Sequence, residues 1–263
     1  MHSDRKTALI TGSGQNIGRG IASQLAQAGF NIIVNGSRNR DAAEAVAAEV
    51  REHGVDALVA MGNVGIKAEA EAVAKAGLDQ FGGSDGLVNN AAIRPHGPFL
   101  EVSEDEWQQV MDVDLNAAIW LSRLILPGMI ANGWGRIINL GTVGSTSPNS
   151  LNPGYYSAKG ALATMTVSLA KEVAGTGVRV NLVSPGMILT PEVQAGYMQR
   201  GLEQGWGSNW DEIEAHVAKD IPIRRISRRE EVAGLVAFLC GPQADAIHGQ
   251  NIKMEGGQLG LVS

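Results

Sequence analysis

Short apolar runs alternate with longer amphipathic stretches along most of the chain, and this alternation limits the possible folds more than any other feature. A short apolar run bounded by turn residues is typical of a buried strand, and apolar residues three and four apart are typical of a helix. Their alternation predicts βα units that build one parallel sheet with helices on both faces. We expect strands at residues 7–10, 31–34, 57–60, 86–89, 136–140, 178–183 and 251–254.

The stretches between these runs carry helix signals. Ile17, Ile21 and Leu25 fall on one face of a helix that follows the first strand. Ser103 and Glu106 form a capping box at the start of another helix. We expect further helices over residues 41–52, 103–126 and 155–174, the second of them ending near the Pro-Gly pair that follows it.

The chain length of 263 residues fits one large α/β domain. We therefore expect a single doubly wound, Rossmann-type sheet over residues 1–263, with ligands bound at the carboxyl ends of its strands. Residues 187–220 break the alternation, because they show no strand pattern and contain Tyr197, Trp206 and Trp210 among glycines and glutamines. An insertion of this kind predicts a substrate lid rather than a second domain.

The composition excludes several classes of protein. The chain has 21 Lys and Arg against 27 Asp and Glu, and this net charge of −6 argues against a nucleic-acid-binding protein. The single cysteine, Cys240, excludes an internal disulfide framework, and the five histidines lack metal-ligand spacing. The start before residue 7 is polar, which predicts no signal peptide, and we identify no apolar run of the roughly 18 residues that span a membrane. We expect a cytoplasmic protein without nucleic-acid, membrane or metal partners.

A glycine-rich segment separates the first predicted strand from the first predicted helix. Glycines allow a tight turn close to a pyrophosphate, and the helix N-terminus offers free amides and a positive dipole end. The segment therefore predicts a dinucleotide-binding loop, with a merely tight turn as the alternative. Gly12, Gly14 and Gly18 leave three residues before the last glycine, whereas the common G-x-G-x-x-G pattern leaves two.

This longer spacing resembles the short-chain dehydrogenase/reductase family. We match the family's T-G-x-x-x-G-x-G motif to Thr11, Gly12, Gly18 and Gly20. Three further family motifs follow in the family's order, and the similarity continues to about residue 257. The motifs Asn-Asn-Ala-Gly, Tyr-x-x-x-Lys and Pro-Gly read here as Asn89-Asn90-Ala91-Ala92, as Tyr155 to Lys159, and as Pro185-Gly186 followed by Thr190.

The resemblance implies cofactor contacts at the positions that match the family's binding residues. Asn63-Val64 stands where the family usually has an aspartate that holds the adenine, and an asparagine keeps the acceptor. The contacts implied are Gly12, Ser13, Gly14, Asn16, Ile17, Gly18, Asn63, Val64, Asn90, Ala91, Tyr155, Lys159, Pro185, Gly186, Ile188 and Thr190.

The residues after the second strand distinguish NAD from NADP. NAD sites place an Asp or Glu there, whose charge repels a 2′-phosphate. Here the chain continues as Asn35-Gly36-Ser37-Arg38-Asn39-Arg40, without a carboxylate. Ser37 can donate a hydrogen bond to a phosphate and Arg38 can pair with it, so NADP is favoured and NAD is the alternative. The arginines can also be surface charges without a ligand.

Tyr155 and Lys159 are four residues apart, so they share one face of a predicted helix. A phenol has a pKa of ~10, which must fall by about 3 units for proton transfer near neutral pH, and a neighbouring ammonium acts in that direction. The resemblance implies that Tyr155 is the acid/base and that Lys159 lowers its pKa and binds the nicotinamide ribose. The family's catalytic serine corresponds to Thr142, which keeps the hydroxyl that bonds the substrate oxygen, and Ser145 is the fallback.

The family's fourth catalytic residue is an asparagine, and Asp114 stands in its place. In the family, the backbone at this point holds a water that relays protons to the lysine. A carboxylate here would raise the pKa of Lys159. The alternative is that Asp114 only bonds neighbouring backbone amides.

Several polar residues are candidates for substrate contacts. Arg94 and His96 follow the Asn-Asn-Ala-Ala segment, where they either receive an anionic or polar substrate or face solvent. Asn149, Asn152 and Trp206 can also reach the pocket.

The function that we expect is hydride transfer between a nicotinamide cofactor and a secondary alcohol or carbonyl compound. This activity is similar to that of 3-oxoacyl carrier-protein reductases and of sugar or steroid dehydrogenases, and the resemblance also implies a homotetramer. A rival from another class is a dinucleotide-binding sensor without catalysis, which the unusual Asp114 and Thr142 motivate.

Overall fold

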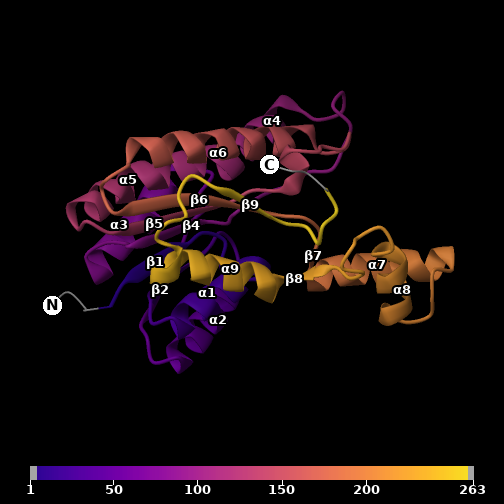
Figure 1. Cartoon of the computed structure of the whole chain (residues 1–263), viewed down its shortest axis with the longest axis horizontal. Coiled ribbons are helices and arrows are strands. Elements are labelled where there is room, and N and C mark those ends of the chain that lie inside the picture. Colours follow the sequence, from indigo (N-terminus) through magenta and orange to yellow (C-terminus); the bar gives the residue numbers. More distant parts are fainter. Residues whose placement is uncertain (1–4, 260–263) are drawn as a thin grey trace.

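The computed structural model describes residues 5–259, which form one parallel sheet between two layers of helices (Figure 1). The strand order is β3-β2-β1-β4-β5-β6-β9, and every neighbouring pair is parallel. The predicted doubly wound sheet is confirmed, and each strand end lies within two residues of its predicted position. The strands are β1 Thr7–Ile10, β2 Asn31–Gly36, β3 Ala57–Met61, β4 Gly86–Asn89, β5 Gly135–Leu140, β6 Val178–Pro185 and β9 Asn251–Met254.

Helices pack on both faces of the sheet because successive strand residues face opposite layers. Ile10 and Val34 lie in the core beneath one layer, and Leu9 and Ile33 lie in the core beneath the other. The first layer consists of α1 Asn16–Gln27, α2 Arg40–Glu52 and α9 Arg229–Cys240; the second consists of α3 Lys67–Phe81, α4 Glu104–Met111, α5 Ala117–Ala131 and α6 Pro153–Glu172 (Figure 1).

The structure confirms the predicted apolar face of α1 and the predicted capping box at the N-terminus of α4. Ile21 and Leu25 are fully buried on the inner face of α1. The Ser103 hydroxyl accepts from the Glu106 backbone N–H, and the Glu106 carboxylate accepts from the Ser103 backbone N–H, which completes the capping box. Cys240 is buried in α9, as its apolar neighbours predict, and burial raises the pKa of its thiol to about 12.

The expected end of the helix near residue 126 is wrong, because α5 continues through Pro127 to Ala131. Proline removes one helical hydrogen bond. Leu121 and Met129, on either side of it, are buried in the core of the second layer, and this packing favours continuation of the helix.

The helical run Glu104–Ala131 is also long and apolar enough, by length and composition, to cross a membrane, so our reading of the sequence missed such a run. In this fold α5 packs against α3 and strands β4 and β5.

A smaller unit extends from the carboxyl edge of the sheet (Figure 1). It consists of α7 Pro191–Gln204, α8 Trp210–Val217 and a two-stranded parallel sheet of β7 Ile188–Leu189 and β8 Ser227–Arg228. The expectation that residues 187–220 contain no strand is therefore wrong, because the short strand β7 lies within this interval. Two residues are too short to give a periodic pattern, and the pairing partner lies outside the interval.

Two short 3₁₀ turns, Val143–Ser145 and Pro242–Ala244, and a π-helical turn, Asp112–Asn116, complete the architecture. The strand order reverses between β1 and β4, so the loops after these two strands diverge at the carboxyl edge. A ligand site is expected at such a point.

Candidate active site

The loop between β1 and α1 turns through two residues with positive φ. Gly12 has φ +64° and Asn16 has φ +49°. Asparagine is one of the few side chains that tolerate this left-handed region. Asn16 therefore occupies the position of the second glycine in T-G-x-x-x-G-x-G, counted from Thr11, and our match of Gly18 and Gly20 to the last two glycines is wrong.

Gly18 is the last glycine of the motif. A Cβ at this position would lie 2.5 Å from the carbonyl oxygen of Gly12 and 2.7 Å from Asn90 Nδ2, which is too close for any side chain. Because residue 18 has no side chain, the first turn of α1 can pack directly against the loop. No side chain caps the N-terminus of α1 in the described structure, so its amides stay available for a pyrophosphate.

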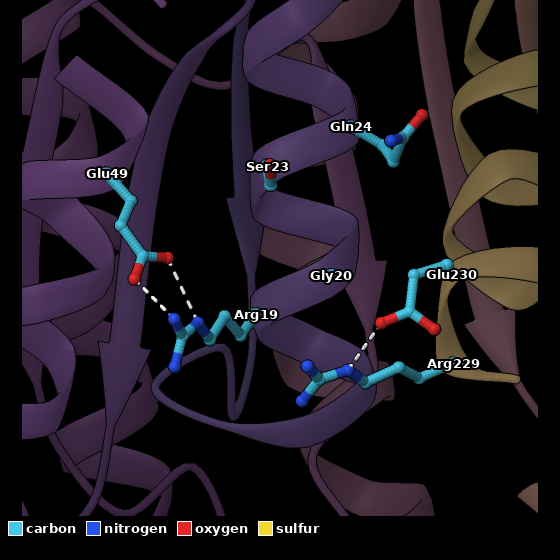
Figure 2. Close-up of a pocket in the computed structure, with 7 residues that line it drawn as sticks. All are labelled: Arg19, Gly20, Ser23, Gln24, Glu49, Arg229 and Glu230. Carbon is cyan, nitrogen blue, oxygen red and sulfur yellow. Dashed lines mark hydrogen bonds and ion pairs between the residues drawn. The ribbon is translucent and has the colours of Figure 1, made fainter. Parts of the chain in front are cut away.

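Gly20 instead faces α9, where a Cβ on it would lie 3.4 Å from Ala233 Cβ. It lines a pocket of about 160 Å³ to which α1, α2 and α9 all contribute, and Figure 2 shows the residues around it. Arg19 pairs there with Glu49, and Arg229 pairs with Glu230. Because both guanidinium groups are already paired with carboxylates, this pocket does not offer a free cation to a ligand.

The glycine loop is held by the ends of β2 and β4. The Thr11 hydroxyl accepts from the backbone N–H groups of Asn90 and Ala91, at 2.9 Å each, and Asn90 Nδ2 donates to the Thr11 carbonyl. Asn35 Oδ1 accepts from the Gly12 N–H at 3.1 Å. Sequence reasoning missed the role of Asn35, although an asparagine directly after the apolar run of the second strand was the available signal.

Two predicted cofactor residues have polar groups that the protein itself uses. Ser13 is buried, its hydroxyl donates to the Ile10 carbonyl at 2.8 Å, and its backbone N–H donates to Asn35. Ser13 therefore has a structural role in the loop, and its contact with a cofactor stays a prediction. Asn63 Oδ1 accepts from the Gly65 N–H at 3.0 Å, so its free group toward an adenine is the amide NH₂ rather than the oxygen.

The residues after β2 leave one cation without a partner. Ser37 and Arg38 are exposed between β2 and α2. Asn39 caps α2 by accepting from Ala42, and Arg40 pairs with Glu44. Within residues 5–259 no ion pair or hydrogen bond is found for the Arg38 side chain, so it remains free for an anionic group.

Tyr155 and Lys159 lie on one face of α6, as predicted, near the carboxyl end of β5. The Thr142 side chain lies close enough to the Tyr155 hydroxyl to lower the pKa of this phenol, and Lys159 Nζ lies 5.9 Å from the centroid of the Tyr155 ring. The hydroxyl of Ser145 donates instead to the backbone carbonyl of Thr142 at 2.7 Å. The structure therefore brings Thr142, and not the fallback Ser145, to the phenol.

Asp114 completes this group from the π-helical turn. Its Oδ1 lies 3.2 Å from Lys159 Nζ, and its Oδ2 accepts from the backbone N–H of Ile93 at 2.9 Å. Asp114 thus bonds a backbone amide and also places a carboxyl group next to Lys159, so it makes both of the contacts that we considered for it.

The protein groups around Tyr155 raise its pKa to about 12. Burial is the largest cause, because a phenolate is poorly solvated there, and the negative charge of Asp114 adds to it. Arg94 and the hydrogen bond from Thr142 act in the opposite direction. The expectation that the protein lowers the pKa of Tyr155 is therefore wrong, because it did not count the burial of the phenol or the negative charge of Asp114 next to it.

The segment that follows β6 packs against the end of β9 and the residue after it. Gly186 N–H donates to the Met254 carbonyl, and a Cβ on Gly186 would lie 3.0 Å from Glu255 Cβ. Ile188 is buried in β7, and the Thr190 hydroxyl caps α7 by accepting from a backbone N–H. The Thr190 hydroxyl thus already has a structural role at the N-terminus of α7.

The predicted substrate residues do not all lie together. Arg94 lies close enough to Tyr155 to influence its pKa, and Asn152 Nδ2 donates to the Pro95 carbonyl and lies 3.5 Å from His96 Nδ1. Asn149 Oδ1 accepts from a backbone N–H within its own loop. Trp206 stacks on His216 of α8, with ring centroids 4.5 Å apart, at the turn between the two lid helices.

Comparison with known proteins identifies the family. Residues 12–258 match a family model described as enoyl-(acyl carrier protein) reductase. A 3-oxoacyl-acyl-carrier-protein reductase of Staphylococcus aureus is 34% identical over 252 residues, which are 96% of this chain and 97% of that protein. The chain belongs to the short-chain dehydrogenase/reductase family. It is accordingly an NAD(P)-dependent oxidoreductase of alcohols and carbonyl compounds, as the sequence predicts.

Other members of the short-chain dehydrogenase/reductase family are similar over the same extent. D-beta-hydroxybutyrate dehydrogenase of Cupriavidus necator is 35% identical over 258 residues, 96% of this chain and 97% of that one. The crystal structure of L-sorbose reductase from Gluconobacter frateurii, complexed with NADPH and L-sorbose, has a TM-score of 0.92 and 32% identity and covers 99% of both chains. This likeness confirms the Rossmann-type fold.

Proposed function

We propose that the chain transfers hydride between NADP and a secondary alcohol or carbonyl compound, with Tyr155 as the acid/base. The observation that carries the proposal is the placement of Thr142 and Lys159 next to the Tyr155 phenol, with the glycine loop at the same edge of the sheet. When bound, the nicotinamide ring supplies or accepts the hydride.

The protein residues then handle the proton and the substrate oxygen. During reduction Tyr155 donates its hydroxyl proton to that oxygen, and during oxidation it takes the proton back. Thr142 donates a hydrogen bond to the same oxygen and steadies it while charge develops. Lys159 holds the nicotinamide ribose and places a positive charge next to the phenol.

The cofactor site fits a dinucleotide with a 2′-phosphate. The uncapped N-terminus of α1 and the close approach at Gly18 suit a pyrophosphate, and the free Arg38 suits the phosphate on the ribose. The NADPH named for the sorbose reductase supports the same choice, with NAD as the alternative. The remaining proposed contacts are Gly12, Ser13, Gly14, Asn16, Ile17, Ser37, Asn63, Val64, Asn90, Ala91, Tyr155, Lys159, Pro185, Gly186, Ile188 and Thr190.

On the substrate side we propose that Arg94 receives an anionic or polar group next to the reacting carbon. Its effect on the pKa of Tyr155 supports this, because it requires the guanidinium to lie near the phenol. His96 and Asn149 line the loops on either side of it, and Trp206 reaches the substrate only if the lid moves.

The assembly that we propose is a cytoplasmic homotetramer acting on small molecules. Exposed apolar residues on the outer side of α5 and α6, among them Leu124, Ile130 and Val167, support self-association through this face.

The test compares Tyr155→Phe with its neighbour Tyr156→Phe as the matched control. The panel contains acetoacetate, L-sorbose and a 3-oxoacyl thioester, with NADPH absorbance as the readout. We expect Tyr155→Phe to lower kcat/KM by about 10²- to 10⁴-fold and the control to change it little, because only the first loses the proton donor. Equal losses in both variants contradict the proposal, and NADPH binding without turnover of any compound supports the sensor alternative.

The cofactor choice is tested with Arg38→Asp and the matched Arg40→Asp. A charge-assisted hydrogen bond is worth about 1.5–3 kcal/mol, so kcat/KM for NADPH should fall by about 10- to 150-fold in Arg38→Asp, while kcat/KM for NADH is unchanged or rises. An NADH preference already present in the unmodified protein contradicts the NADP assignment.

A further inference from the structure

The most enclosed ion pair in the described part of the chain lies inside the catalytic group. The side chains of Lys159 and Asp114 are 2% and 0% exposed, and Nζ and Oδ1 are 3.2 Å apart. Two charges are removed from water here, which costs free energy that their attraction must offset. A neutral asparagine, the residue that we matched to this position in the family, avoids that cost, so the carboxylate calls for an explanation.

Three separate elements hold the carboxylate in place. The π-helical turn carries it, with the Ala117 N–H bonded to the Asp112 carbonyl five residues earlier. The loop after β4 donates the Ile93 N–H to Oδ2, and α6 supplies Lys159. Such turns are rare and frequently occur at functional sites. Two of these three elements, the π-helical turn and the Ile93 N–H, hold Asp114 without Lys159.

The charges that face Tyr155 come from several elements. Asp114 on the π-helical turn raises the pKa of the phenol, and Tyr156 on α6 acts in the same direction. Arg94, on the loop after β4, lowers it. Burial also raises the pKa of Asp114 itself, while the ammonium of Lys159 and the hydrogen bond from Ile93 oppose this. The Lys159 ammonium next to one oxygen and the Ile93 N–H on the other both favour the charged form of Asp114, against the effect of burial.

We propose that Asp114 is a positioning residue for proton transfer: its carboxylate pairs with the Lys159 ammonium and thereby offsets the positive charge that would otherwise act on Tyr155. The proposal rests on the proposed role of Tyr155 as the proton carrier.

This pairing has a consequence for the direction of the reaction that is favoured at a given pH. Oxidation of an alcohol requires the ionised phenol, whereas reduction of a carbonyl requires the protonated one. A negative charge next to the phenol raises its pKa, so it favours the proton-donating form over a wider pH range. The pair therefore favours reduction near neutral pH and moves the acid limb of the oxidation profile toward alkaline pH.

The experiment measures the ionisation of Tyr155 directly. The chain has three tyrosines, so the tyrosinate absorbance of the purified protein can be titrated, and the Tyr155→Phe variant isolates the signal of Tyr155. The titration is repeated in Asp114→Asn, which keeps the size and the hydrogen bond to Ile93 but removes the charge. The matched control is Asp112→Asn, on the same turn, whose carboxylate accepts from Gln108 and Asn116 and does not contact Lys159.

We expect the Tyr155 midpoint to fall by about one pH unit or more in Asp114→Asn and by less than half of that in the control. The acid limb of alcohol oxidation should move down by the same amount. A folded Asp114→Asn protein with an unchanged midpoint, or an equal shift in Asp112→Asn, overturns the proposal. If Asp114→Asn does not fold, Asp114→Ser supplies the same change of charge with a smaller side chain.

Because the titration requires no turnover, it separates this proposal from the proposed function. A midpoint shift in a protein whose oxidation rate ignores Tyr155→Phe supports the electrostatic role and rejects the catalytic one. An unchanged midpoint in a protein that needs Tyr155 for activity does the reverse.

Discussion

Two ion pairs in this protein have similar chemistry and opposite behaviour. Lys159 and Asp114 are enclosed under the edge of the sheet, whereas Arg228 and Glu214 join β8 to α8 at the base of the lid with side chains 34% and 11% exposed. The pKa of Asp114 is raised, because burial outweighs the attraction of Lys159. The pKa of Glu214 is lowered, because its milder burial is outweighed by hydrogen bonds from Arg228 and the Ile226 backbone.

The difference shows that access to water decides what an ion pair does. Near water the cost of burying the charges is small, and the pair ties one element to another with a modest gain in stability. Away from water the cost is large, so the enclosed pair contributes little net stability but a strong local field. The lid pair thus has a mechanical role, and the pair at Tyr155 has an electrostatic one.

We expect the largest difference between the two ion pairs in the free energy of unfolding that is lost when the cation of each pair is removed. Lys159→Met leaves a buried carboxylate alone, and we expect a loss of about 3–5 kcal/mol in the free energy of unfolding. Arg228→Met leaves Glu214 with partial access to water and with the Ile226 N–H, so the loss should be about 0.5–1.5 kcal/mol. Urea unfolding measures both; losses of equal size contradict the comparison.

The substrate side offers a further contrast, because Arg94 is a cation near Tyr155 without a described partner. We expect Arg94→Ala to lower kcat/KM for acetoacetate by about tenfold or more and to leave its neutral ethyl ester nearly unchanged, since only the anion gains a charge-assisted bond. Lys171→Ala, at the far end of α6, is the control. Equal effects on acid and ester indicate that Arg94 acts only through Tyr155.

The smallest effect should be a difference in the pH dependence of stability. Glu214 has a lowered pKa, so its contribution is present above its unfolded-state pKa of ~4.3 and is lost as the pH falls through the folded-state value. Asp114 has a raised pKa, so its contribution is present at acid pH and is lost as the pH rises. The Tm difference between the unmodified protein and Glu214→Gln should therefore fade on acidification, whereas the Tm difference between the unmodified protein and Asp114→Asn should shift in favour of the unmodified protein as the pH falls. The same pH dependence for both differences contradicts the comparison.

The parts of the fold that depend on local pattern could be predicted from the sequence. The seven strands follow from apolar runs such as those around Leu9 and Ile138, and α1 follows from Ile21 and Leu25. Helices α3 and α9 were not predicted, because their apolar residues are spread around the helix and give a weaker periodic signal. The extension of α5 beyond Pro127 depends on packing against the sheet, which no local rule contains.

Only the parts of the site that belong to sequence motifs could be predicted. Tyr155, Lys159 and Thr142 come together as the spacing indicates. The positive φ of Asn16 and the hydrogen bonds of Asn35 require knowledge of how the loops meet. The rise in the pKa of Tyr155 could not be predicted either, because it arises from burial and from a carboxylate more than forty residues earlier in the chain.

The most direct test of the central claim follows the hydride and the proton separately. The best carbonyl compound of the panel is reduced with NADPH that carries deuterium at C4 of the nicotinamide, and the product alcohol is analysed by NMR. The account predicts deuterium on the carbinol carbon, at a rate that Tyr155→Phe reduces by about 10²- to 10⁴-fold and Tyr156→Phe leaves nearly unchanged. Deuterium absent from that carbon, or transferred equally fast by Tyr155→Phe, would contradict it.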